Sequence, residues 1–391
     1  MTPRRSRWWE TAIRLAAAGT LDPYVHAAYR IRGWGRLPQP RDATLVVANH
    51  QHDLDSMAIM SRLILQGPWP EPIRTVSSRR MFEPGFFAVR TPWVAPLVRR
   101  YDPSALFAAL GPMPIENDLR WRTLRSVCAT VRRLHGNLPL ADVIAQPVRE
   151  AIGFPDDVRV DDLGRPPWFD LASAPVDLHG LREPYRADLL RETRRLLDED
   201  LARIEDALRS GGTFFVTPEG HYSTDGRMLR FRAVFARLAP LADIWLAAIS
   251  YDPLRGRRLS QLYRIVRPAF ADDIVASLKA ARPVTVSHLF ATWLLARGDE
   301  SFTEADAVTG IAAALAALPP TAFIDPELRA SPPRTVVESI ETSLRLGVLE
   351  RGAARLRLAE RRRHPRFADV ADIVAFQAAS LEETLEALRR P

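Results

Sequence analysis

The amino-acid sequence predicts an α/β layered fold with a mostly parallel central sheet, followed by an all-α C-terminal extension. As far as about residue 271, short apolar runs typical of buried strands alternate with longer segments of helical periodicity. Beyond that point only helical patterns remain. We therefore expect an N-terminal helical segment over 1–32, an α/β domain over 33–271 and a helical region over 272–391.

Each expected element rests on its own local pattern of apolar residues and turn residues. The apolar runs predict strands at 44–48, 73–77, 111–117, 213–216 and 244–249. Apolar residues at helical spacing predict helices at 56–65, 119–134, 186–209, 286–297, 303–318, 335–363 and 370–389. Residues 135–185 lose periodicity and are rich in turn residues, which predicts a loop-rich surface insertion.

The first residues, about 3–18, predict an amphipathic helix. Glu10 and Arg14 share its polar face, and the tandem Trp8 and Trp9 lie among arginines. Indole rings and cations suit a lipid headgroup layer, whereas the same helix could equally pack on the surface of its own domain. Both alternatives remain open at this stage.

Composition limits the classes of protein to consider. The chain has 391 residues, of which 47% are hydrophobic and 26% charged, which is typical of a globular protein. Its formal net charge of +7 favours anionic partners such as phospholipid headgroups, coenzyme A or an acidic carrier protein, and we expect no nucleic acid among them. A single cysteine excludes a disulfide within the chain. No apolar run reaches the roughly 18–20 residues that span a bilayer, so we expect a cytoplasmic, peripheral protein.

The most informative segment runs from Asn49 to Asp55, directly after the apolar run 44–48 and before a helical pattern. This pattern predicts a sharp turn between strand and helix, and one turn of helix would bring Asp55 back towards the ring of His50. A histidine paired with a carboxylate is a competent general base near neutral pH, because the carboxylate fixes the tautomer of the imidazole and stabilises its protonated form. His50 and Asp55 are therefore the candidate catalytic residues.

This segment resembles the first motif of the glycerolipid acyltransferase superfamily, N-H-x-x-x-x-D, which Asn49, His50 and Asp55 match. The run from Gly33 to Pro38 is similar to the glycine and Leu-Pro approach to that motif. The resemblance implies the layered acyltransferase fold. It also implies transfer of a fatty acyl group from acyl-CoA or acyl-carrier protein to a hydroxyl or amine of a lipid-type acceptor.

A second match, to the third conserved block of the family, strengthens the resemblance. The family pattern F-P-E-G-T-R-S is matched at Pro218, Glu219, Gly220 and Ser223, after the strand expected at 213–216. Further on come Asp225-Gly226-Arg227 and Phe231, with Arg232 in the place of the family's lysine. Ligands bind at the carboxyl edge of open α/β sheets, so Glu219 is positioned either to accept a hydrogen bond from the acceptor or to brace the neighbouring loop.

Two departures from the family pattern concern the acceptor. Asn117 stands where the second block usually ends in an arginine, and His221 and Tyr222 replace the Thr-Arg pair of the third block. In the family those arginines are understood to hold the acceptor's phosphate, and neither Asn nor Tyr replaces their charge. Either the acceptor has changed, which we favour, or other arginines hold its phosphate; the candidates are Arg120, Arg227 and Arg230. Arg232, in the lysine place, is a further candidate for binding substrate.

If the acceptor's phosphate is still held, the resemblance implies lysophosphatidate or glycerol 3-phosphate as acceptor, in phospholipid biosynthesis at the inner face of the membrane. The implied mechanism has His50 as general base, with backbone N–H groups after Asn49 or near Gly220 meeting the oxyanion. It needs no metal and no cofactor besides the acyl thioester.

Two other functions compete with this interpretation. His50-Gln-His52-Asp53 partly matches the H-x-H-x-D-H motif of binuclear zinc hydrolases, although Leu54 and Asp55 stand where that motif needs Asp and His. A lipid-binding protein with an inactive acyltransferase fold would also explain the replaced arginines. Against that alternative, His50, Asp55, Glu219 and Gly220 are all retained.

Overall fold

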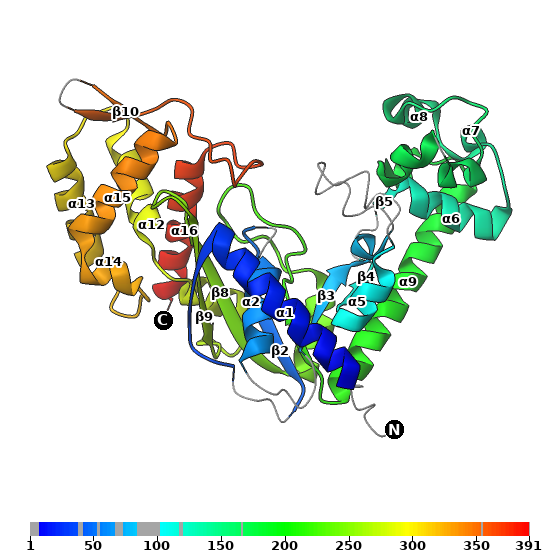
Figure 1. The fold of residues 1–391 in the computed structure, drawn as a ribbon, viewed down its shortest axis with the longest axis horizontal. Coiled ribbons are helices and arrows are strands. Elements are labelled where there is room, and N and C mark those ends of the chain that lie inside the picture. The colour runs from blue at the N-terminus through cyan, green and yellow to red at the C-terminus, as the bar shows by residue number, and fades with distance from the viewer. Residues whose placement is uncertain are drawn as a thin grey trace. The chain divides into compact units, whose positions relative to one another are not determined.

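The computed structural model describes residues 8–37, 42–52, 55–66, 73–83, 102–116, 120–165, 167–352 and 355–390. They form two compact units (Figure 1). One unit combines Met1–Arg74 with Leu208–Pro391, and the other is Thr75–Ala207. This division does not coincide with the boundaries expected at residues 33 and 272, because the C-terminal helices share a core with the sheet of the first unit.

A mostly parallel central sheet of seven strands agrees with the predicted α/β layered fold. In the first unit its strand order is β1-β9-β8-β2-β7. Pairing is parallel for β1 with β9 and for β2 with both β7 and β8, whereas β8 and β9 form an antiparallel pair. The bounds of these strands are Tyr29–Trp34 (β1), Thr44–Ala48 (β2), Thr213–Val216 (β7), Asp243–Asp252 (β8) and Leu259–Val266 (β9).

Strands β2 and β7 lie where the sequence predicts them, β8 continues beyond its predicted end at residue 249, and β1 and β9 were not predicted. The two missed strands contain charged or polar residues at positions such as Arg30, Gln261 and Arg264, so they are not continuous apolar runs. Tertiary pairing rather than local apolarity makes them strands.

Strand β2 and the elements beside it bring the two segments that resemble the acyltransferase motifs to one edge of the sheet. Every residue of β2 is buried, and Val47 lies in register with Val216 of β7. Because β2 and β7 are parallel, the segments that leave their carboxyl ends, with His50 and Glu219, emerge at the same edge. Helix α2 (Asp55–Leu65) starts directly after this edge, as the sequence predicts.

The helical region after residue 272 is present but is not all-α. Its helices are α11 (Ile274–Ala281), α12 (Val286–Arg297), α13 (Glu304–Ala316), α14 (Pro326–Ala330), α15 (Pro332–Arg345) and α16 (Ile373–Leu388), and the short α10 (Ala233–Leu238) precedes them. The helix predicted over 335–363 is wrong beyond Arg345. There the chain turns at Gly347, which has φ +69°, into an antiparallel pair of β10 (Leu349–Arg351) and β11 (Leu356–Leu358).

The N-terminal helix α1 (Trp8–Ala28) is longer than predicted, and its faces differ from the expected ones. Arg14, expected on the polar face, is buried, whereas Leu15 is exposed. Helix α1 packs against α2 and β1, so the helix lies on the surface of its own unit. The predicted pattern failed because the helix has no strong apolar stripe and its buried side was set by the partner elements.

The second unit includes most of β3 (Ile73–Ser78), which pairs in parallel with β4 (Met113–Ile115). A short antiparallel pair joins β5 (Trp121–Thr123) to β6 (Pro175–Asp177). Its helices are α5 (Ser104–Leu110), α6 (Leu124–His135), α7 (Leu140–Val143), α8 (Gln146–Ile152) and α9 (Tyr185–Arg209). The helix predicted from residue 119 begins only at Leu124, because residues 121–123 form β5 and Thr123 caps the helix.

The loop-rich surface insertion predicted over 135–185 has a hydrophobic core of its own. Leu140, Val143, Val176 and Leu178 are fully buried in it, beside Val127 of α6. These apolar residues come from several short elements, so no single period appears in the sequence although together they form a core.

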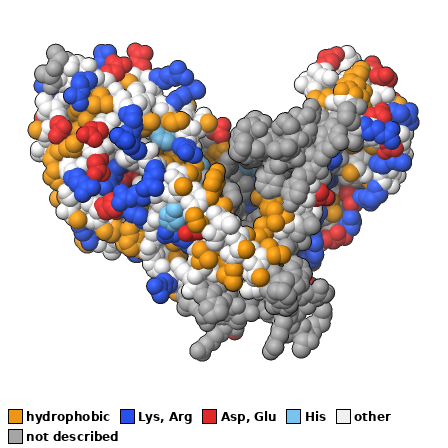
Figure 2. All heavy atoms as spheres, in the orientation of Figure 1, with side chains coloured by type: hydrophobic (Ala, Val, Ile, Leu, Met, Phe, Trp, Pro, Cys, Tyr) orange, Lys and Arg blue, Asp and Glu red, His pale blue; other side chains and the backbone are white. Residues whose placement is uncertain are grey.

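The charged side chains of the described surface are mixed in sign. In Figure 2, Lys and Arg on the visible face of the helices after residue 272 are interspersed with Asp, Glu and hydrophobic side chains. Among the described residues, no helix combines the length and the hydropathy that a bilayer-crossing segment needs.

Gly226 marks a close approach between α16 and the loop that follows β7. Its φ is +87°, and a Cβ built at this position would lie 2.0 Å from the backbone oxygen of Phe376. Gly211 provides a matched comparison, since its φ is +86° but nothing lies within 4 Å of the corresponding Cβ position.

We expect Gly226→Ala to destabilise the protein by about 3 kcal/mol and Gly211→Ala by only about 1 kcal/mol. Both substitutions strain the left-handed backbone, but only the first also forces α16 away from the loop. Chemical denaturation monitored by circular dichroism measures the difference. Equal losses in the two variants would contradict the close packing of α16 on this loop.

Candidate active site

The turn after β2 is fixed to the sheet by Asn49. This side chain is fully buried; its Nδ2 donates to the carbonyl of Ile249 (3.0 Å), and its Oδ1 accepts from the amide of the same residue (2.7 Å). The side-chain amide of Asn49 thus bonds the backbone of β8, as a neighbouring strand would, just where β2 ends. The following residue, His50, therefore leaves the sheet in a defined direction.

His50 and Asp55 are in contact, as the sequence predicts. The distance between His50 Nδ1 and Asp55 Oδ2 is 3.1 Å; the histidine side chain is 15% exposed and the aspartate side chain is fully buried. Asp55 Oδ2 also accepts hydrogen bonds from the amides of Gln51 (2.6 Å) and His52 (2.8 Å). Asp55 is the first residue of α2, so the turn of residues 49–52, rather than a turn of helix, brings the pair together.

The second oxygen of Asp55 has partners that the sequence analysis missed. The hydroxyl of Tyr251 donates to Oδ1 through a short hydrogen bond, and Gln261 Nε2 donates to the same oxygen (3.2 Å) and to Tyr251 (3.0 Å). Tyr251 lies beyond the predicted end of β8 and Gln261 lies in the unpredicted β9. The only available signal was their polarity within otherwise apolar runs.

These donors decide the charge of Asp55. Burial alone would raise the pKa of the carboxyl, but the interactions with His50, Tyr251 and the amide of His52 hold it below the ordinary value of 3.8. Asp55 is therefore a carboxylate at neutral pH, able to hold the imidazole of His50 in one orientation and to stabilise its protonated form.

Glu219, in the loop that follows β7, holds the same turn in place. Its Oε1 accepts from the amide of His50 (2.7 Å) and its Oε2 from the amide of Leu229 (2.6 Å). Of the two roles open to it in the sequence, the geometry is that of a brace, because both oxygens bond backbone amides. Burial raises the pKa of Glu219 from 4.5 to about 7, although these two amides and the nearby charges of His50 and Arg282 act to lower it.

Gly220 and Arg232 lie together beside this brace. Gly220 has φ +75°, and a Cβ there would lie 2.3 Å from Arg232 Nε. Arg232 Nε in turn donates to the carbonyl of Glu219 (3.3 Å). A glycine at 220 therefore allows a guanidinium to approach the backbone that leads to the site.

The C-terminal region supplies part of the site, which the resemblance did not cover. The rings of His50 and Tyr222 make an edge contact at 5.8 Å, and the hydroxyl of Tyr222 donates to Asp369 Oδ2 (2.6 Å). His52 Nε2 bonds the carbonyl of Arg366 (2.9 Å), and its ring lies 5.4 Å from that of Phe367. Nothing in the local sequence of residues 364–369 marks them as neighbours of residues 50–52.

Helix α16 also holds the loop that follows Glu219. Glu383 Oε2 accepts from the amide of Met228 (3.0 Å) and pairs with the buried Arg282 (2.9 Å). Gln51 Nε2 donates to Ser380 Oγ (3.4 Å), which joins the His50 turn to the same helix. The turn that carries His50 and the loop that follows Glu219 are thus both attached to α16.

Two of the arginines expected to replace the phosphate grip, Arg227 and Arg120, are ion-paired within the chain. Arg227 pairs with Glu382 through a short contact, and Arg120, which belongs to the second unit, pairs with Asp177 (2.8 Å). Arg230 is exposed in the loop after Gly226. His221 is exposed beside Tyr222, and Asn117 lies outside the described residues.

Four of the backbone donors in the two regions expected to meet an oxyanion are bonded within the chain. The amide of His50 bonds Glu219, those of Gln51 and His52 bond Asp55, and that of Gly220 bonds the carbonyl of Thr217 (3.1 Å). The His-Asp turn needs these amides to stabilise its own buried carboxylates. Within the described ranges, no group of three His, Cys, Asp or Glu residues is placed to hold a metal ion.

Comparison with known proteins adds no family assignment. No model of a known protein family matches this chain, and no curated protein sequence matches it. The chemistry of the site therefore rests on its geometry and on the motif resemblance.

The raised pKa of Glu219 has a consequence for stability. The folded pKa of about 7 lies above the ordinary pKa of 4.5, so the folded protein binds more protons than the unfolded chain between these pH values. The contribution of this group is fully present below about pH 4.5 and is lost as the pH rises through about 7.

We expect the wild-type protein to lose up to about 3 kcal/mol of unfolding free energy from this group between pH 5 and pH 8. Glu219→Gln should remove this part of the pH dependence, while Glu341→Gln, an exposed acid on α15, should retain it. Urea denaturation at several pH values gives the slopes. Identical slopes for the wild type and Glu219→Gln would contradict the assignment.

Proposed function

We propose that this chain is an acyltransferase that moves a fatty acyl group from acyl-CoA or acyl-carrier protein to a hydroxyl or amine of a lipid-type acceptor. One observation carries the proposal. A partly exposed histidine, His50, is held on Nδ1 by a fully buried carboxylate, Asp55, in the order of the N-H-x-x-x-x-D motif. This is the arrangement of a general base that must accept and return one proton.

The residues perform the reaction in the following way. With Nδ1–H donating to Asp55, the base of His50 is Nε2, which removes the proton of the acceptor hydroxyl as its oxygen attacks the thioester carbonyl. The tetrahedral intermediate collapses to the ester and expels the thiolate. The thiolate takes the proton back from His50, so the enzyme returns to its starting state. Arg232, beside Gly220, supplies positive charge near the reacting carbonyl.

The surroundings of His50 favour an unphosphorylated acceptor. Tyr222, which touches the His50 ring, donates to the carboxylate of Asp369, and Arg227 is ion-paired with Glu382. An acceptor phosphate at this position would meet a like charge rather than a guanidinium fork. A neutral hydroxyl or a cationic amine meets no such repulsion. Such an acceptor fits a role in lipid metabolism at the inner face of the membrane, with the protein bound peripherally through its net positive charge.

His50→Ala is expected to lower the rate of acyl transfer from labelled acyl-CoA or acyl-carrier protein by at least about 100-fold, because general-base catalysis contributes typically 10²–10⁴-fold. His179→Ala, an exposed histidine of the second unit, serves as the control and should leave the rate unchanged. Turnover is measured against a panel of phosphorylated and unphosphorylated acceptors. Lipid binding without turnover would favour the inactive lipid-binding alternative, and equal rates in both variants would exclude His50 as the base.

Asp369→Asn should raise the kcat/KM for a phosphorylated acceptor relative to its unphosphorylated counterpart by about 3- to 10-fold at low ionic strength, since it removes one negative charge near His50. Asp299→Asn removes an exposed charge elsewhere and is the matched control. A ratio unaffected by Asp369→Asn would show that this carboxylate does not select the acceptor.

A further inference from the structure

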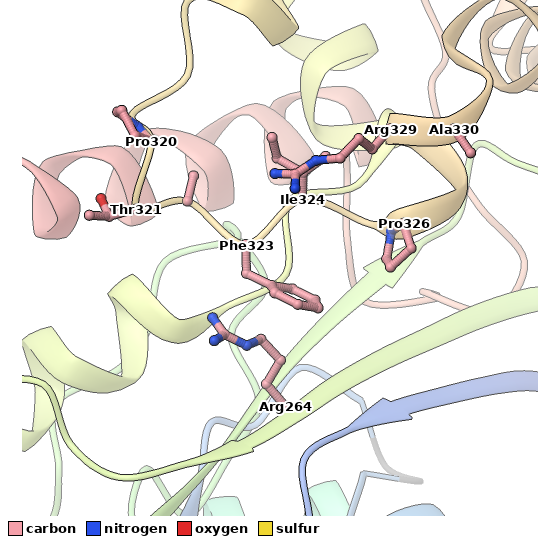
Figure 3. Close-up of a pocket in the computed structure, with 9 residues that line it drawn as sticks. Arg264, Pro320, Thr321, Phe323, Ile324, Pro326, Arg329 and Ala330 are labelled. Carbon is pink, nitrogen blue, oxygen red and sulfur yellow. The ribbon is translucent and has the colours of Figure 1, made fainter.

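A hollow of about 520 Å³ lies in the first unit between strand β9 and the segment that leads into α14. Arg264, Phe323, Ile324, Pro326 and Arg329 line it, so two guanidinium groups share the hollow with apolar side chains (Figure 3). Side chains three residues apart on a strand point to opposite faces, so Arg264 faces away from Gln261, which bonds Asp55. The hollow is therefore separate from the His50 site.

Among the described residues, no carboxylate pairs with Arg264. Its guanidinium lies 4.2 Å from the centre of the Phe323 ring and donates a long hydrogen bond of 3.5 Å to the carbonyl of Ala281. Arg267, three residues on, stacks in the same way on Trp245 at 4.3 Å but is also ion-paired with Asp243. Burial alone lowers the pKa of Arg264, with no carboxylate opposing it.

The acidic residues next to the hollow are committed to other arginines. Asp325 pairs with Arg32 at 2.6 Å, and Glu327 pairs with Arg255 at 2.9 Å. Of the described residues, none forms a hydrogen bond or ion pair with the side chain of Arg329, which is exposed at the rim. The positive charge of the hollow is thus not balanced by the chain itself.

We propose that this hollow binds a small amphipathic anion, with a carboxylate or phosphate at Arg264 and Arg329 and an apolar body against Phe323 and Pro326. A half-buried guanidinium without a counter-ion is costly, and an anionic ligand supplies the missing charge through charge-assisted hydrogen bonds. The rings of Phe323 and Trp34 make an edge contact with their centres 5.2 Å apart, which supports the apolar wall.

The test is isothermal titration of the full chain with hexanoate, hexyl phosphate, hexanol and inorganic phosphate at constant ionic strength. Saturable binding is expected for hexanoate or hexyl phosphate, and whichever binds more tightly identifies the anionic group. Hexanol lacks the anionic group and inorganic phosphate lacks the apolar chain, so each should bind at least tenfold more weakly. Equal binding of either control compound would overturn the proposal.

Variants assign the binding to the hollow. Arg264→Gln should weaken binding at least tenfold, Arg264→Lys less, and Arg329→Ala several-fold, while Arg267→Gln should change it less than twofold. Because Arg329 is exposed, its variant tests the site even if substitution of Arg264 impairs folding. Binding that is insensitive to both Arg329→Ala and Arg264→Lys, or absent from the wild type, would overturn the proposal. His50→Ala should bind as the wild type does, since the inference is independent of acyl transfer.

Discussion

The buried carboxylate of Asp55 is the constraint on which the rest of the site depends. A charge with no exposed surface is tolerated only if hydrogen bonds replace its hydration. Two backbone amides, the hydroxyl of Tyr251, the amide of Gln261 and the ring of His50 provide this replacement. These groups come from the turn after β2, from β8 and from β9. The carboxylate of Asp55 is therefore stabilised only when these three strands are neighbours in the sheet.

A second buried carboxylate, Glu219, makes the arrangement cooperative. It holds the amide of His50 while Asp55 holds the amides of the next two residues, so consecutive backbone groups are divided between two acids. The turn is thereby rigid without help from a ligand. The two acids differ in charge state because Asp55 has side-chain donors on both oxygens, whereas Glu219 has only backbone amides. One site thus holds a firmly ionised carboxylate and another that titrates near neutrality.

The C-terminal helices complete the site rather than extend the domain. Helix α16 bonds the loop after Glu219 and the turn after β2, and the segment before it brings Asp369 to Tyr222. Glu383 of α16 forms a buried ion pair with Arg282. As in the Asp55 cluster, fixed partners within the chain stabilise the buried charges. Arg264, by contrast, has no carboxylate partner among the described residues.

The sequence by itself determined the local features: the buried strands β2 and β7, helix α2 and the contact between His50 and Asp55. Each follows from short-range information, since a continuous apolar run or a fixed spacing of a few residues is sufficient. Only the tertiary structure decided the partners of Asp55 about 200 residues away, the buried side of α1 and the role of residues 364–369. Those outcomes depend on strand register and on packing between distant segments, which no local pattern encodes.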